Sequence, residues 1–95
     1  MIRVTGVGLP PDNISNPSHK LYAIKRAAQV DAMRKLTESI RGVIIKGKTN
    51  ITNGNLNKDE IEIRVDAILK SARTISGKEL ADGSYEIIME APINQ

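Results

Sequence analysis

Few residues in this 95-residue sequence have the types and spacing that catalysis or metal binding requires. His19 is the single histidine, and cysteine is absent. A histidine that acts as a general base needs an orienting partner and a reacting group beside it, and a zinc site needs several histidine or cysteine ligands. The sequence places no such partner, reacting group or second ligand near His19, which we interpret as a surface residue. We therefore predict no catalytic residue, no metal site and no cofactor, in a protein that is not an enzyme.

Two motifs resemble ligand-binding loops but have the wrong spacing. Gly6-Val7-Gly8 follows an expected strand, as a phosphate-binding turn would, yet Pro11 stands in place of the third glycine. The next helix also begins too far along the chain for its amides to reach a phosphate, so we interpret the motif as a kink or bulge. Polar residues alternate along a later segment, faintly like a calcium loop: Asn53, Asn55, Asn57 and Asp59. Calcium needs more carboxylates than this segment provides, and Asn57 is better suited to capping a helix.

Arg26 and Asp31 are two opposite charges on the first helix that we considered as a possible catalytic pair. They lie five residues apart, too far round a helix for an ideal ion pair at i and i+4. We therefore expect each side chain to find a partner off the helix, and we interpret both as structural rather than catalytic.

Charge is distributed unevenly along the chain. Residues 1–48 carry nine Lys or Arg against three acids, whereas residues 49–95 carry five against eight. A basic half can bind an anionic ligand or nucleic acid. Single-strand binders also use stacking aromatics, and the sequence has two tyrosines and no other aromatic residue. A solvated helix face is the simpler interpretation, so an anion-binding or nucleic-acid-binding module is the alternative function. Its candidate residues are Lys20, Lys25, Arg26, Arg34, Lys35 and Arg41.

Local patterns predict a single α+β domain over residues 1–95, in the order β-α-β-α-β-β. Alternating residues predict strands at 2–8, 43–52, 73–80 and 84–91, the last two joined by a hairpin at Asp82-Gly83. One helix is predicted from Asn16-Pro17 to residue 40 or 41, with Gly42 as its C-cap. The other follows Asn57, which has Glu60 three residues on. Such a domain has a mainly antiparallel sheet with both helices on one face.

The first helix has two apolar sides. One is a ridge at steps of three and four that comprises Leu21, Ile24, Ala28, Ala32, Leu36 and Ile40. Other small or apolar residues fall elsewhere on the helix, which should therefore contact two objects, such as the sheet and another helix or subunit. We predict that this second side is an interaction surface formed by Ala23, Ala27, Val30, Arg26, Arg34 and Arg41. No apolar run approaches the 18 residues of a membrane span.

The long helix resembles the signature of a known family. Arg26 to Val43 reads R-A-A-x-x-D-A-x-R-x-L-x-E-x-I-x-G-V, which resembles the LPP-twenty lipoprotein family; the flagellar proteins FlgP and the N-terminal part of FlgT are similar. The opening V-T-G-V-G-L-P-P and the closing A-D-G-S-Y-E-I agree with it. The resemblance therefore covers nearly the whole chain.

This resemblance implies a non-enzymatic structural or interaction module of the bacterial cell envelope. Relatives are lipid-anchored surface or outer-membrane proteins, and some build oligomeric rings around the flagellar motor. We therefore expect an exported protein whose partner is itself, as a homo-oligomer, or another envelope protein. The sequence shows no leader and no cysteine that could carry a lipid, so a lipid anchor is expected only in a longer precursor. The family prescribes no catalytic residues.

Overall fold

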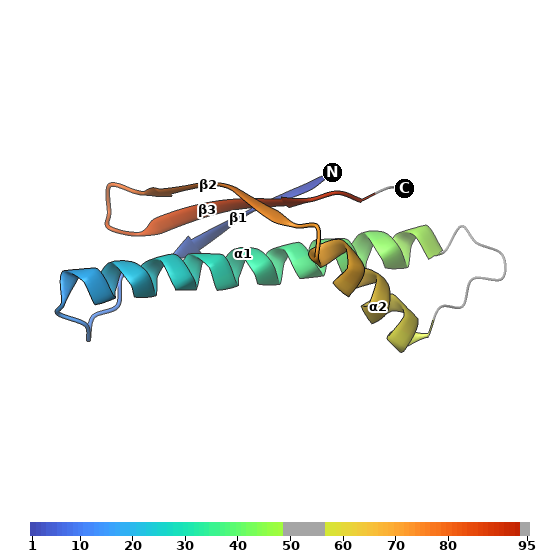
Figure 1. The fold of residues 1–95 in the computed structure, drawn as a ribbon, viewed down its shortest axis with the longest axis horizontal. Helices are drawn as coiled ribbons and strands as arrows, with labels where there is room; N and C mark the ends of the chain where they lie inside the picture. The colour runs from blue at the N-terminus through green and yellow to red at the C-terminus, as the bar shows by residue number, and fades with distance from the viewer. Residues whose placement is uncertain (49–56, 94–95) are drawn as a thin grey trace.

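The computed structural model describes residues 1–48 and 57–93, which form an α+β domain (Figure 1). In chain order its elements are β1 (Ile2–Gly8), α1 (Pro17–Lys48), α2 (Lys58–Leu69), β2 (Arg73–Glu79) and β3 (Tyr85–Ala91). The α+β class agrees with the prediction, but the order is β-α-α-β-β.

The three strands form one antiparallel sheet in the order β1-β3-β2, with β3 in the middle. β2 and β3 form the predicted hairpin, in which the Leu80 amide donates to the Ser84 carbonyl oxygen at 2.9 Å. Gly83 in this turn has a φ of 89°, a conformation that glycine adopts without the penalty other residues incur. The predicted hairpin at Asp82-Gly83 is confirmed.

Both helices begin at the caps that the sequence predicts. Asn16 Oδ1 accepts a hydrogen bond from the Ser18 amide at 2.9 Å, and Pro17 occupies the first helical position, where no backbone donor is needed. Asn57 Oδ1 accepts from the Glu60 amide at 2.8 Å. Each asparagine thus satisfies a donor that the first helical turn leaves unpaired.

The predicted strand at 43–52 and the predicted helix end at Gly42 are wrong. α1 continues through Gly42 to Lys48, and residues 49–52 lie outside the described part of the chain. The β-branched residues at 43–45 favour a strand locally, but Ile44 packs against the hydrophobic core, and tertiary burial outweighs that weak preference. A Cβ added to Gly42 would meet none of the described atoms within 4 Å. This glycine therefore marks neither a turn nor a close contact.

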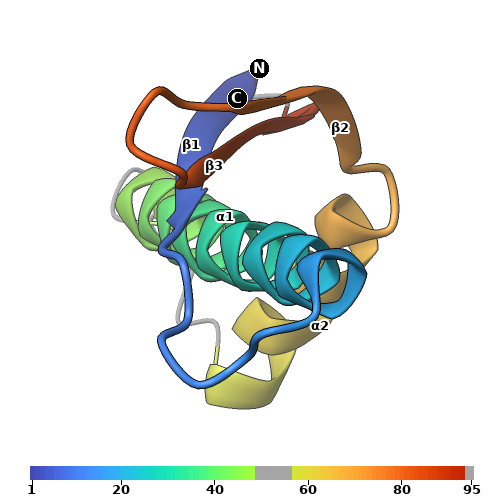
Figure 2. The ribbon, with the colours of Figure 1, turned by 90° about the vertical axis from the view of Figure 1, so that its left-hand side faces the viewer.

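The core lies between α1 and the sheet. Five of the six residues of the predicted ridge are buried: Ile24 is 6% exposed, and the four that follow it are fully buried. Leu21, at the start of the ridge, is half-buried. Figure 2 shows the sheet on one side of α1, with both helices on the same face of the sheet. α2 lies against the C-terminal half of α1, where Val65 enters the core (Figure 1). The ridge packs with Val65, Ile87, Met89 and Ala91.

β1 rests directly on the backbone of α1 at two glycines. A Cβ added to Gly6 would overlap the carbonyl oxygen of Ala28 and the amide nitrogen of Ala32, and one added to Gly8 would overlap the carbonyl oxygen of Ile24. The register of β1 on β3 is unbroken across both glycines, so the predicted kink or bulge is wrong. Glycine is needed here because strand and helix approach more closely than any side chain allows.

We predict opposite effects of one alanine substitution in the strand and one in the helix. Gly6→Ala should destabilise the domain by about 3 kcal/mol or more, because the backbone of α1 cannot yield to the new methyl group. Gly42→Ala should stabilise it by about 0.5–1 kcal/mol, because glycine in a helix interior costs backbone entropy. Thermal unfolding followed by circular dichroism measures both. Equal melting temperatures for the two variants would show that β1 does not sit on α1 as described.

Candidate interaction surface on α1

The candidate site residues have the following positions in the described part of the chain. Within 1–48 and 57–93, no three His, Cys, Asp or Glu side chains gather where they could hold a metal ion. No helix in the same part of the chain is both long and apolar enough to cross a membrane. His19 is exposed in the first turn of α1. Asn53 and Asn55 of the calcium-like segment lie outside the described residues, and Asn57 caps α2.

Asp31 connects α1 to the outer edge of β1. Its Oδ2 accepts a hydrogen bond from the Val7 amide at 2.9 Å, and Lys35 Nζ donates to the Thr5 carbonyl oxygen at 3.0 Å. Asp31 also pairs with Lys35 at 3.1 Å and with Arg34 at 2.9 Å. The Val7 amide, followed by the Lys35 and Arg34 side chains, lowers the pKa of Asp31 to about 2. The two side chains satisfy backbone groups that an edge strand otherwise exposes.

The expectation for Arg26 and Asp31 is therefore met in part. Asp31 does find a partner off the helix, in the backbone of β1, but its ion-pair partners come from α1 itself. Arg26 is exposed, and none of the ion pairs within residues 1–48 and 57–93 includes it.

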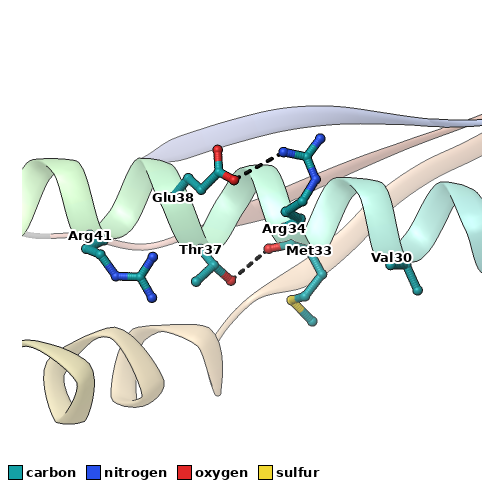
Figure 3. A pocket seen from close by; sticks show the side chains of 6 residues that line it. All are labelled: Val30, Met33, Arg34, Thr37, Glu38 and Arg41. Atoms are coloured by element: carbon teal, nitrogen blue, oxygen red, sulfur yellow. Dashed lines mark hydrogen bonds and ion pairs between the residues drawn. The ribbon is translucent and has the colours of Figure 1, made fainter. Parts of the chain in front are cut away.

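A groove of about 320 Å³ lies along an exposed side of α1. Figure 3 shows Val30, Met33 and Thr37 projecting to one side of the helix, while Arg34 and Glu38 project to the other and pair with each other. The Thr37 hydroxyl donates to the Met33 carbonyl oxygen at 2.8 Å, so its donor is satisfied without a hydrogen bond to a binding partner. The groove is lined by Val30, Met33, Arg34, Thr37, Glu38 and Arg41.

Large apolar side chains remain exposed on this side of α1. Tyr22 is 67% exposed, Val30 58% and Met33 37%. Together with Arg26 they follow one another at steps of four, four and three residues, so all four share one side of the helix. We call Tyr22, Arg26, Val30 and Met33 the outer strip. Exposed apolar side chains grouped beside polar ones are typical of an interaction site.

α2 covers the continuation of the outer strip toward the end of α1. Arg41 donates to both carboxylate oxygens of Glu62, at 2.8 and 2.7 Å, and Ile44 packs against the core cluster that includes Val65. Arg41 and Ile44 lie about three and four turns beyond Val30, on the same side of the helix. The side of α1 that α2 covers in its C-terminal half is therefore uncovered in its N-terminal half.

The structure distributes the six predicted surface residues along this side. Met33, Thr37 and Glu38 also line the groove and were missed. Two of them could have been predicted from the sequence: Met33 and Thr37 follow Val30 by three and seven residues, the spacing that places residues on one side of a helix. Of the predicted residues, those lining the groove are Val30, Arg34 and Arg41, those exposed beside it are Arg26 and Ala27, and Ala23 is half-buried.

Acids already engage several of the cations that the alternative function would use. Arg34, Lys35 and Arg41 each pair with a carboxylate, at 2.9, 3.1 and 2.7 Å. Lys25 lies over the ring of Tyr85, 5.5 Å from its centre. Among the six candidate cations, the three without an acidic partner in the described chain therefore all lie in the first half of α1; they are Lys20, Lys25 and Arg26.

We predict that the contribution of Asp31 to stability is lost in acid. Its folded pKa of about 2 lies below the unfolded value of about 3.9, so its contribution is complete above about pH 5 and vanishes as the pH falls through 2. Asp31→Asn should cost about 1–2 kcal/mol at pH 7, allowing for partial exposure. Urea unfolding at pH 7 and pH 2.5 measures the difference, with Asp12→Asn in an exposed loop as control. A cost that is the same at both pH values would contradict this role.

The chain matches no protein-family model, no curated protein and no solved structure. The resemblance to the LPP-twenty lipoprotein family therefore stays a prediction drawn from the sequence motif.

Proposed function

We propose that this protein is a non-enzymatic structural or interaction module that self-associates through the outer strip of α1. The observation that carries the proposal is the exposure of Tyr22, Val30 and Met33 in one row beside a groove. Removing a large apolar side chain from water contributes about 1.5–3 kcal/mol when burial is complete. Three such side chains in one row favour a partner that covers them together.

A second copy of the chain is the partner that the surface itself favours. In the C-terminal half of α1, the same side of the helix already packs against a helix, α2, which supports a helix as the partner for the uncovered half. The neighbouring Ala23 and Ala27 are small and allow a second backbone to approach closely. Closed symmetric dimers are also the commonest form of self-association.

The α1 motif supports a location in the bacterial cell envelope. On the strength of its resemblance to the LPP-twenty lipoprotein family, the proposal includes export and a link to surface or flagellar assembly, with another envelope protein as the second candidate partner. Fractionation of the producing bacterium tests this component. Recovery in the cytosolic fraction alone would remove the envelope assignment without affecting self-association.

The alternative is a module that binds an anionic ligand or nucleic acid. It is supported by the first half of α1, where residues 17–30 include Lys20, Lys25 and Arg26 and no acid. Binding of an oligonucleotide through these cations should weaken steeply as salt rises, because counterions are released on binding. Failure to bind at about 50 mM salt would eliminate this function.

We predict that Val30→Glu prevents self-association without unfolding the domain. A charge in the middle of the outer strip would have to be buried without a partner, which should weaken the complex at least about tenfold. The melting temperature of the monomer should change little, because Val30 is 58% exposed and such surface changes stay within about 0.5 kcal/mol.

Sedimentation velocity across a hundredfold concentration range measures this association. Leu9→Glu is the matched control, because Leu9 is equally apolar and 70% exposed but lies after β1, outside the outer strip. A wild-type chain that stays monomeric throughout, or a Val30→Glu variant that associates like the wild type, would refute the proposed use of this surface.

A further inference from the structure

α2 carries an exposed apolar residue surrounded by acids on the side opposite its core contact. Val65 is 1% exposed, whereas Ile63 is 68% exposed. Asp59, Glu60 and Asp66 are all exposed and stand four residues before, three before and three after Ile63, so they surround it on the helix surface.

The charges of α2 and of the first half of α1 are opposite. Residues 58–69 contain two bases and four acids, one of which, Glu62, pairs with Arg41 of the same chain. Residues 17–30 contain three Lys or Arg and no acid. On the outer strip, Arg26 separates Tyr22 from Val30 and belongs to none of the ion pairs in the described chain. An apolar centre with an acidic border therefore exists on one helix, and an apolar row with an unpaired cation exists on the other.

The α2 of the same chain cannot cover the outer strip. It is held against the C-terminal half of α1 by the two hydrogen bonds from Arg41 to Glu62 and by burial of Val65. Its acidic outer side consequently points away from the α1 to which it is bound, and a complementary surface has to come from another molecule.

We propose that α2 of a second copy lies on the outer strip, with Ile63 against Val30 and Met33 and Asp66 beside Arg26. This inference rests on the proposed self-association and specifies which surfaces meet. The contact is reciprocal, so a two-fold axis relates the copies and each α2 is enclosed between two α1 helices. Because the same two copies make both contacts about this axis, the assembly closes as a dimer; a contact made in one direction only would build a ring or a filament.

A charge exchange tests the pairing of Arg26 with Asp66. Arg26→Glu alone and Asp66→Lys alone should each weaken dimerisation about tenfold or more, because each places like charges in contact. The variant with both changes should recover most of the wild-type affinity. Lysine near the C-terminal end of α2 is compatible with the helix dipole, so Asp66→Lys is expected to fold. Asp12→Lys, in an exposed loop, is the control for the change in net charge.

Disulfide trapping gives a second measurement, since the wild-type chain has no cysteine. Ile63→Cys chains mixed with Val30→Cys chains should form a mixed disulfide dimer under mild oxidation, whereas Ile63→Cys mixed with Ser15→Cys should not. Ser15 precedes α1 and is outside the outer strip.

The outcomes separate this inference from the proposed function. Recovery in the double variant together with the mixed disulfide supports the pairing. The pairing is overturned if the wild type dimerises and both single variants dimerise with the same affinity. It is also overturned if the single variants lose affinity and the double variant does not recover it. Either result leaves self-association standing. A wild-type chain that stays monomeric at all concentrations overturns both.

Discussion

The contact between the backbone of β1 and the backbone of α1 determines how the rest of this domain is arranged. Gly6 and Gly8 have no side chain to hold the strand away, and Ala28 on the facing ridge is fully buried. α1 therefore lies under β1 and β3, and every residue of β2 remains exposed. A single helix held this close to one side of a three-stranded sheet is too narrow to cover all of it.

The same close approach makes α1 the cover for an open strand edge. Asp31 and Lys35 stand next to β1 and satisfy the Val7 amide and the Thr5 carbonyl, so these two groups at the outer edge are not available to pair with a further strand. On the uncovered face of the sheet, Glu90 is 4% exposed and pairs with Arg73 and Arg3. Arg73, and then Arg3, lower the pKa of the Glu90 carboxyl. Much of the charge of this basic protein is therefore used to hold its own elements together.

α2 completes the core without covering the whole of α1. Val65 and the ion pair between Arg41 and Glu62 fix it at the C-terminal half of the long helix. The outer strip in the other half keeps its apolar side chains in water. A 32-residue helix thus has more apolar surface than one sheet and one short helix can bury, and this surplus is the physical basis for the proposed self-association.

Local chemistry in the sequence determined the caps, the turn and the buried ridge. Asn16, Asn57 and Gly83 act within a few residues of themselves, and a ridge at steps of three and four needs only helical geometry. Tertiary structure decided the rest. Residues 43–45 are all β-branched and apolar, a run whose periodicity fits strand or helix. Packing of Ile44 against the core selects the helix. The role of Gly6 depends on a helix more than twenty residues away, and the extent of the outer strip depends on where α2 ends. These are distances between elements, and no local pattern of residue types encodes them.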